Sequence, residues 1–266
     1  MEEFETSLKT ELMKHDVYDI DITECGKEPT WIPASLVSSG DKISVFDDHF
    51  GTVGSLVKTH DGKLAFISAA HVLGEGNFAM VQKCESDNPV YVGKCIWSQH
   101  VNVPFYDLLD LSLVQLKDNV ENQIENLGKH QHIDGRWFRY IMYEGEFEDI
   151  LGNKVYKIGA CTGYTNGIIA SNEFFPDPKN EKVIIGEAWI VEPLEESEPF
   201  MKEGDSGSMV YIFKRPNDPP IQFISMAQAQ GRDTEAKKSL TSALKHSIDR
   251  YESSTQKTIQ VNFSES

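Results

Sequence analysis

Long apolar runs and cysteines are both scarce in this sequence of 266 residues. No run of about 18 apolar residues occurs, so no transmembrane helix is predicted. The four cysteines are too few for a disulfide scaffold and lack the C-x-x-C spacing of a zinc site. They are Cys25, Cys84, Cys95 and Cys161. Cys84 and Cys95 could meet across a hairpin under oxidising conditions, but we prefer free, buried thiols.

Basic residues are also in deficit. Lys and Arg total 25 against 42 Asp and Glu, which gives a formal net charge of −17. Such a charge repels phosphate, so we expect neither nucleic acid nor an anionic membrane as a partner. The stretch from Met1 to Glu5 is acidic where a secretory signal is basic and then apolar. Unless a leader has been removed, this favours an intracellular, cytoplasmic protein.

The rest of the composition is that of a globular protein, with 39% hydrophobic and 10% aromatic residues. Near the start, Phe4, Leu8 and Leu12 recur at four-residue intervals, which predicts a short amphipathic helix. The acidic stretch that follows has no sustained period. We therefore interpret residues 1–41 as a helix and an acidic connecting arm.

From Lys42 onward, short strand-like segments alternate with turn residues. Asp61-Gly62 is a predicted hairpin turn between two of them. About a dozen such strands with no long helix between them predict an antiparallel all-β barrel or sandwich. The predicted strands are Ile43–Phe46, Thr52–Lys58, Leu64–Ser68, Met80–Lys83, Tyr91–Trp97, Leu111–Leu116, Trp137–Tyr143, Val155–Ile158, Gly167–Ala170, Val183–Val191, Met209–Phe213 and Ile221–Ala227.

The pattern changes near the carboxyl end. Leu240, Leu244, Ile248 and Tyr251 recur at steps of three and four residues, which predicts a terminal helix over about 234–252. Residues 254–266 are mostly polar, and we expect this tail to fray.

Three short motifs carry chemistry, and the first is a histidine after two alanines, Ala69-Ala70-His71, at the end of an apolar strand. The small alanines let an imidazole approach the neighbouring backbone. Taken alone, the motif is more typical of a satisfied core or edge histidine than of a catalyst.

The second motif places Asp110 directly before a strand whose alternate residues are apolar. A carboxylate there must be solvated at the strand mouth or buried against a donor. An ordinary turn aspartate is the alternative.

The third motif is Gly204-Asp205-Ser206-Gly207, followed by a strand. Glycines permit positive φ and close backbone approach, so Ser206 can project from a tight turn whose N–H groups converge. Such a turn fits an oxyanion site, and a plain Gly-Ser turn is the alternative.

Together the three motifs supply what acyl transfer by serine needs: a nucleophile, an imidazole base and a carboxylate that fixes the imidazole tautomer. At these positions the sequence resembles the chymotrypsin-like (trypsin-like) serine proteases of the PA clan. The family's Ala-Ala-His is Ala69–His71, its Asp-(Ile/Leu)-Ala-Leu is Asp110–Leu113, and its Gly-Asp-Ser-Gly is Gly204–Gly207. The segment Lys157–Gly163 is similar to the Gly-x-x-Thr-Gly that opens the second barrel in some compact relatives. The resemblance covers roughly residues 42–250.

The resemblance implies two six-stranded antiparallel barrels, at about 42–130 and 131–232, with the active site between them. The protease domain would then span residues 42–253, with the terminal helix inside it.

The resemblance also implies roles for residues. Ser206 becomes the nucleophile, His71 the general base and acid, and Asp110 the orienting carboxylate. Backbone N–H groups of Gly204 and Ser206 would hold the oxyanion, and no metal or organic cofactor is required. Asp107 is a rival for the carboxylate role, but we favour Asp110 because it alone is followed by the apolar alternation.

Two features of the family are missing. No cysteine flanks the histidine, and Lys202 stands where a cysteine usually precedes the serine, which suits a reducing compartment. No Ile-Val-Gly-Gly-like segment occurs either. In trypsin-type zymogens its freed ammonium pairs with the aspartate equivalent to Asp205. A buried Asp205 would need another donor, such as an Arg, a Lys or a pair of backbone N–H groups. The enzyme either folds directly active or is gated by its amino-terminal arm or a regulatory partner.

Specificity is predicted from the family alignment. Phe200 falls at the base of the primary specificity pocket, with Ser225, Met226 and Ala227 in its wall. Because no aspartate occupies the base, a preference for Arg or Lys is not supported, and an apolar pocket favours apolar or aromatic substrate side chains. Nearby glutamates are interpreted as a solvated acidic loop, with attraction of basic substrate residues as the alternative. These are Glu192, Glu195, Glu196, Glu198 and Glu203.

The leading interpretation is an intracellular serine endopeptidase that cleaves polypeptides through an acyl-enzyme. An esterase or a self-processing protease is a related interpretation. A catalytically inactive, protease-like binding module is the alternative from a different class, and the intact set of motifs argues against it. An acidic scaffold protein would explain the charge but not the ordered motifs.

Overall fold

The chain divides into two compact units, residues 1–33 and 34–266, and all the residues described here belong to the second unit. The predicted amino-terminal helix, most of the acidic arm, Cys25 and Cys84 lie outside the described residues. The computed structural model describes residues 37–45, 50–82, 88–103, 106–121, 124, 129–131, 137–177, 180–195, 198–215, 218–230 and 238–261.

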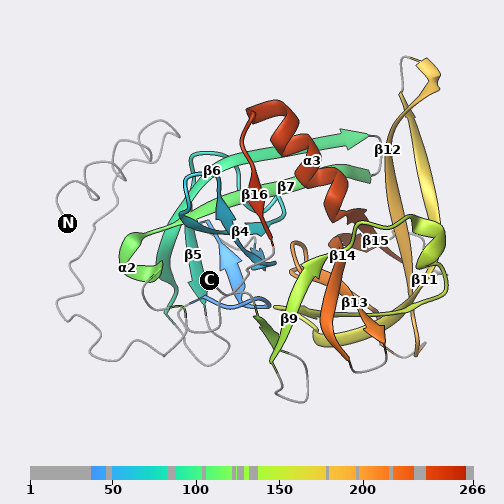
Figure 1. Ribbon diagram of the computed structural model, residues 1–266, viewed down its shortest axis with the longest axis horizontal. Coiled ribbons are helices and arrows are strands. Elements are labelled where there is room, and N and C mark those ends of the chain that lie inside the picture. Colours follow the sequence, from blue (N-terminus) through green and yellow to red (C-terminus); the bar gives the residue numbers. More distant parts are fainter. Residues whose placement is uncertain are drawn as a thin grey trace. The chain divides into compact units, whose positions relative to one another are not determined.

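The first sheet contains eight antiparallel strands in the order β16-β3-β4-β7-β6-β5-β1-β2. Among the described residues no pairing joins β16 to β2, so this sheet is an open half-barrel. Most of its strands are drawn from blue to green in Figure 1. They are β1 (Lys42–Ser44), β2 (Phe50–Thr52), β3 (Leu56–Thr59), β4 (Leu64–Ser68), β5 (Phe78–Gln82), β6 (Val90–Val103), β7 (Tyr106–Leu116) and β16 (Ile259–Gln260).

The second sheet has the order β13-β10-β11-β12-β15-β14-β9-β8, and a further pairing of β13 with β14 closes six of its strands into a barrel. The strand β9 pairs with β14 in parallel, whereas all strands within the closed barrel pair antiparallel. The strands are β8 (Lys129–Gln131), β9 (Trp137–Met142), β10 (Lys154–Gly159), β11 (Gly163–Asp177), β12 (Asn180–Pro193), β13 (Met209–Arg215), β14 (Asp218–Gln230) and β15 (Ser239–Ala243). Among the described residues, the helical elements are α2 (Asp118–Glu121), the 3₁₀ turn η1 (Phe147–Asp149) and α3 (Leu244–Thr255).

The predicted all-β, two-barrel class with a carboxyl-terminal helix is therefore confirmed, with one barrel closed and the other open.

The hairpin turn at Asp61-Gly62 is also confirmed. Gly62 has φ +82°, and its N–H donates to the carbonyl of Thr59 at 2.8 Å, which reverses the chain between β3 and β4. Glycine adopts this left-handed conformation without the cost that a Cβ would add.

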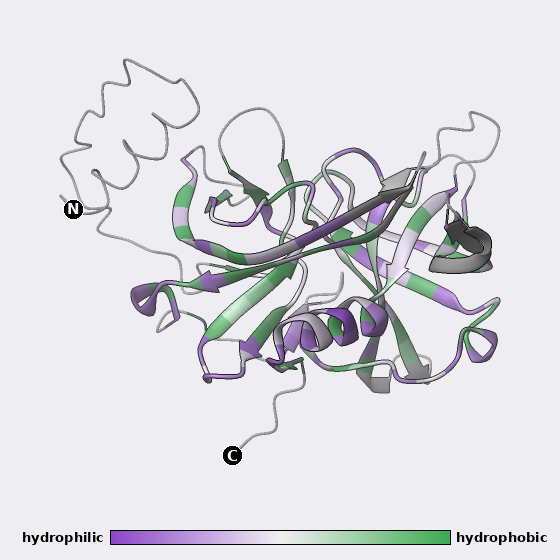
Figure 2. Cartoon of the chain, turned by 90° about the horizontal axis from the view of Figure 1, so that it is seen from above, coloured by the Kyte–Doolittle hydropathy of each residue, from purple (hydrophilic) through white to green (hydrophobic). Residues whose placement is uncertain are grey.

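One buried cluster joins the two sheets. It contains Leu113 of the first sheet, Phe223 of the second and Ile248 of α3, each at most 2% exposed. The helix α3 contacts β7 of the first sheet as well as β14 and β15 of the second. In Figure 2 hydrophobic residues run through the strands of both sheets, whereas α3 is largely hydrophilic apart from its buried face. A shared apolar core of this kind holds the two halves as one unit.

The structure corrects two predictions about the carboxyl end. Residues 239–243 are the strand β15 rather than the start of the terminal helix, because they fill the gap between β12 and β14 that closes the barrel. Backbone pairing on both sides outweighs the helical spacing of Leu240. Residues 259–261, within the tail that was predicted to fray, also form part of the fold. Ile259 and Val261 are buried on either side of Gln260, and β16 pairs with β3.

Among the described residues, no helix is long and apolar enough to cross a membrane. Cys95 is buried and Cys161 is exposed, and both are free thiols. Burial raises the pKa of the Cys95 thiol to about 11.

Candidate active site

His71 and Asp110 are brought together by the pairing of β4 with β7. Ser68, the last residue of β4, lies opposite Ser112 of β7, and a tight turn after β4 places His71 over Asp110. The main-chain N–H of His71 donates to Oδ1 of Asp110 at 2.8 Å, and its ring Nδ1 contacts Oδ2. Asp110 is wholly buried, whereas the imidazole is 33% exposed. Because the carboxylate binds Nδ1, it favours the proton on that nitrogen and leaves Nε2 as the basic atom.

The turn that carries Ser206 requires glycine at positions 204 and 207. Gly204 and Gly207 both have φ +95°. A Cβ at Gly204 would lie 2.3 Å from the ring of Phe50, and one at Gly207 would lie 2.4 Å from Oγ of Ser68. The turn therefore needs glycine for conformation and for space.

The Ser206 turn packs against the segment that carries His71. The N–H of Thr52 donates to the carbonyl of Ser206 at 2.8 Å. A Cβ at Gly51 would lie 2.6 Å from the Val72 side chain and 2.7 Å from the Ser206 carbonyl oxygen, so these two residues flank the same glycine. The turn that carries Ser206 and the segment that carries His71 thus lie next to each other, although they are far apart in sequence.

The Ser206 hydroxyl has a different partner in this structure. It donates to the main-chain carbonyl of Gln228 at 2.9 Å, and within the described residues no hydrogen bond joins it to His71. Sequence reasoning did not identify Gln228. No motif marks it, because its role comes from its carbonyl and from the bulge in β14 between Ala227 and Ala229.

The N–H groups around Ser206 fall into two sets. Those of Asp205 and Gly207 donate to the carbonyls of Lys202 and Ala227, at 3.0 and 2.9 Å. Those of Gly204 and Ser206, the predicted oxyanion donors, have no acceptor among the described residues. A substrate oxygen would therefore not have to displace an internal partner from them.

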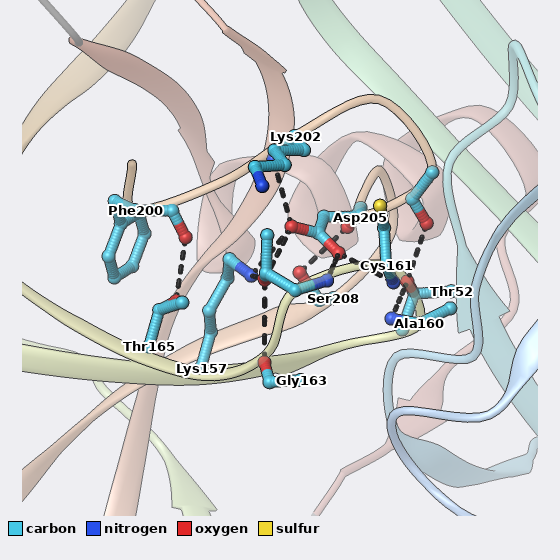
Figure 3. Close-up of polar contacts among 12 residues, drawn as sticks. Thr52, Lys157, Ala160, Cys161, Gly163, Thr165, Phe200, Lys202, Asp205 and Ser208 are labelled. Atoms are coloured by element: carbon cyan, nitrogen blue, oxygen red, sulfur yellow. Dashed lines mark hydrogen bonds and ion pairs between the residues drawn. The ribbon is translucent and has the colours of Figure 1, made fainter. Parts of the chain in front are cut away.

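The carboxylate of Asp205 is buried and fully hydrogen-bonded (Figure 3). Its Oδ1 accepts the N–H groups of Cys161 and Thr162, both at 3.0 Å. Its Oδ2 accepts Lys157 Nζ and the Lys202 N–H, each at 2.9 Å, and the Thr162 hydroxyl at 2.7 Å. The sequence predicted an Arg, a Lys or a pair of backbone N–H groups as the donor for a buried Asp205, and the structure supplies the last two of these.

The electrostatics of this group follow from burial and pairing. Burial alone raises the pKa of Asp205, but the charge of Lys157 and the hydrogen bonds from Thr162 and the backbone outweigh it, and the pKa lies below its usual value. Burial lowers the pKa of Lys157, and the attraction of Asp205 opposes that shift. Both side chains are wholly buried. Lys157 shares the buried face of β10 with Val155 and Gly159. The sequence predicted a donor for Asp205 but did not identify this lysine.

The predicted specificity residues are all buried. Phe200 has no exposed surface and lies in the core of the second barrel, where its carbonyl accepts the Thr165 hydroxyl at 2.6 Å. Met226 is in the core between the sheets. Ser225 pairs with Val210 along the strand. Their role in a pocket stays a prediction.

Ala227 is the member of the predicted pocket wall that lies directly beside the Ser206 turn. Its N–H donates to the carbonyl of Ser208, and its carbonyl accepts the N–H of Gly207, both at 2.9 Å.

In the described part of the chain, no group of three or more His, Cys, Asp and Glu is arranged to hold a metal ion.

No protein-family model and no curated protein matches this sequence. Solved structures do match. Thermobifida fusca protease A aligns with a TM-score of 0.55 and 13% identity over 85% of this chain and 98% of its own. A protein described as a glutamic acid-specific serine protease that uses a histidine triad in substrate binding aligns at 0.56 and 14% identity, over 85% and 100%. Cellulomonas bogoriensis chymotrypsin aligns at 0.53 and 14%, over 85% and 99%.

At these identities the similarity establishes the fold alone. The chain has the all-β, two-barrel, chymotrypsin-like fold of the PA-clan serine proteases, with one closed barrel, one half-barrel and a carboxyl-terminal helix.

Proposed function

We propose that this protein is a serine endopeptidase, with Ser206 as nucleophile, His71 as general base and acid, and Asp110 as the orienting carboxylate. The observation that carries the proposal is the pair of contacts from His71 to the buried carboxylate of Asp110, made beside a glycine turn that presents Ser206. The fold supports polypeptides as substrates.

The proposed reaction runs in two halves. Nε2 of His71 takes the hydroxyl proton as Ser206 Oγ attacks the peptide carbonyl, and Asp110 stabilises the imidazolium. The tetrahedral oxyanion accepts hydrogen bonds from the N–H groups of Gly204 and Ser206, each worth on the order of 3 kcal/mol in the transition state. The imidazolium gives its proton to the leaving amine, which leaves an acyl-enzyme. Water then attacks the ester with the same proton transfers, and free Ser206 is restored.

The hydrogen bond from Ser206 to Gln228 bears on this scheme. The hydroxyl must rotate away from the Gln228 carbonyl and toward His71 before it can transfer its proton. Catalytic hydrogen bonds are often long or misaligned without substrate and form only in the complex. The same observation favours the second candidate, an inactive protease-like binding module in which the hydroxyl stays on Gln228.

A fluorophosphonate probe separates the two candidates, since it phosphonylates only a serine that an adjacent base activates. We expect stoichiometric labelling of the full chain at Ser206, cleavage of an unstructured polypeptide, and loss of both in Ser206→Ala. Ser253→Ala, at an exposed serine of α3, is the matched control and should retain both. If the folded wild-type chain is neither labelled nor able to cleave, the binding module is the correct interpretation.

A further inference from the structure

We propose that Thr52 is a positioning residue that holds the turn carrying Ser206 in place against the segment carrying His71. The inference rests on the proposed function, because it concerns how the nucleophile is aligned with its base and with the oxyanion donors. Thr52 is the last residue of β2, belongs to none of the three sequence motifs and has no exposed surface.

The first step is that the main chain of Thr52 bonds to both halves of the site. Its N–H donates to the carbonyl of Ser206 at 2.8 Å. Its carbonyl accepts the hydroxyl of Ser68 at 2.8 Å, and Ser68 ends β4 just before the turn that carries His71. The backbone at Thr52 therefore lies between the two segments and sets the spacing between them.

The second step is that the Thr52 hydroxyl makes two more bonds. It donates to the carbonyl of Gly204 at 2.9 Å and accepts the N–H of Ala160 at 2.9 Å, the latter drawn in Figure 3. A hydroxyl has one proton to donate and lone pairs to accept, so a single side chain can make both bonds. A valine has the same shape and could make neither.

The third step is what the bond to Gly204 fixes. Gly204 carries one of the two proposed oxyanion N–H groups, and its φ of +95° lies where glycine has unusual freedom. The peptide that follows Gly204 is held at both ends, since its carbonyl accepts the Thr52 hydroxyl and the Asp205 N–H donates to the Lys202 carbonyl at 3.0 Å. Holding this peptide limits rotation at Gly204, and the oxyanion N–H keeps its direction.

The fourth step is that the Thr52 hydroxyl connects the first sheet with the second barrel. Thr52 belongs to β2, whereas Ala160 follows β10 and Gly204 precedes β13. Apolar packing between the sheets is not directional, but hydrogen bonds are. The base comes from the first sheet and the nucleophile from the second barrel. A misplacement of about 1 Å between reacting groups can cost on the order of 100-fold in rate, so a directional connection beside them matters.

The test compares Thr52→Val and Thr52→Ser with the wild-type full chain. Thr59→Val is the matched control, because it removes another buried threonine hydroxyl of the first sheet. That hydroxyl donates to the Lys63 carbonyl at 3.1 Å, at the end of β3 away from Ser68. Fluorophosphonate labelling rates and kcat and KM for a peptide substrate are measured, and urea denaturation checks that each variant is folded.

We expect Thr52→Val to lose on the order of 100-fold in labelling rate and in kcat, with KM within about threefold, because alignment is lost while the substrate contacts remain. Thr52→Ser, which keeps the hydroxyl, and Thr59→Val should both stay within about threefold of the wild type. Labelling of folded Thr52→Val within about threefold of the wild-type rate would overturn the proposal. So would a loss of about tenfold or more in Thr52→Ser, a result that counts even if Thr52→Val does not fold.

Hydrogen exchange makes the outcome independent of activity. The N–H of Ala160 should be protected in the wild type, and its rapid exchange in the folded protein would refute the bond to Thr52. In Thr52→Val, the N–H at position 52 and that of Asp205 should both lose protection as the Ser206 turn loosens. If the wild type is not labelled at all, the proposed function fails, whereas unchanged exchange of these two N–H groups in folded Thr52→Val refutes the positioning role by itself.

Discussion

Asp110 binds His71 twice, once through the main-chain N–H and once through ring Nδ1. The two contacts fix both the position of the residue and the tilt of its ring. Since Asp110 is wholly buried while the imidazole is one-third exposed, the paired edge of the ring faces the protein. In the proposed reaction, proton transfer is therefore assigned to the other ring nitrogen, Nε2.

Replacing this carboxylate tests the pairing directly. Asp110→Asn keeps the shape but donates an N–H toward Nδ1, which favours the wrong tautomer. We expect kcat to fall by about 10³- to 10⁴-fold, as expected for an Asp-to-Asn change in a Ser-His-Asp catalytic triad. Asp107→Asn, at the rival position three residues earlier on β7, is the matched control and should remain within about threefold of wild type. Loss of activity in the Asp107 variant instead would reassign the carboxylate role.

The Ser206 turn makes a second prediction, about stability. Gly207→Ala places a Cβ 2.4 Å from Ser68 Oγ and 2.5 Å from the Thr52 carbonyl, at φ +95°. Strain and overpacking together should lower the free energy of unfolding by about 3–5 kcal/mol. Gly62→Ala has a similar φ of +82° but nothing within 4 Å, so it should cost only about 1–2 kcal/mol. Urea denaturation of both variants measures the difference, and equal losses would show that space at Gly207 is not limiting.

Much of this site could be predicted from local sequence. His71 and Ser206 stand in turns next to strands, whereas Asp110, predicted to precede a strand, lies within β7. Each belongs to a short motif, so residue type and spacing were enough to propose them. The strand that closes the second barrel was not predicted from the sequence. Residues 239–243 form a strand because β12 and β14 both need a partner, and no local signal reports that need.

Lys157 and Gln228 were missed for different reasons. Lys157 lies on the buried face of β10, but no local pattern marks that face as buried. Its partner lies 48 residues away in sequence, and only the fold brings Asp205 to it. Gln228 acts through its carbonyl, which every residue carries, so side-chain identity gives no signal. Interactions that depend on backbone placement follow from topology and not from motifs.

Substrate preference gives a third prediction. The proposed pocket base, Phe200, is an apolar side chain with no exposed surface and no aspartate in its place. We expect cleavage of a peptide library after apolar or aromatic residues, because a charged substrate side chain would lose its hydration there. The Lys157 ammonium, 5.6 Å from the centre of the Phe200 ring, is already paired with Asp205. Sequencing of the cleaved peptides measures the preference. A strict requirement for Glu, or for Lys and Arg, would contradict Phe200 as the base of the pocket.

Thiol chemistry gives a fourth prediction. Cys95 is buried and the pKa of its thiol is raised to about 11, so almost none of it is thiolate at neutral pH. Cys161 is exposed on the turn that anchors Asp205. Because the thiolate is the reactive form, iodoacetamide should modify Cys161 in the native protein and reach Cys95 only after denaturation. Peptide mapping by mass spectrometry checks both sites, with urea-treated protein as the control. Equal native reactivity would show that Cys95 is not shielded.

Acid titration gives the last prediction. The pKa of Asp205 is held below its usual value by Lys157 and its hydrogen bonds, despite burial. The stability that this carboxylate contributes is therefore present above its unfolded pKa of about 3.9 and is lost as the pH falls through the lower folded pKa. Lys157 stays protonated in this acid range in the unfolded chain and pairs with the carboxylate in the folded one, so Asp205 is the group that titrates.

Urea denaturation at intervals from about pH 6 to about pH 2 measures this contribution. Asp205→Asn should be less stable than wild type at the upper end, and the difference should shrink as the pH falls, because the wild type then loses the same charge. Asp249→Asn removes the exposed carboxylate that pairs with Lys245 at 2.8 Å and is the matched control. Its effect should be small at every pH, since exposed ion pairs contribute little. A stability gap between wild type and Asp205→Asn that is constant with pH would mean that the charge of Asp205 does not stabilise the fold.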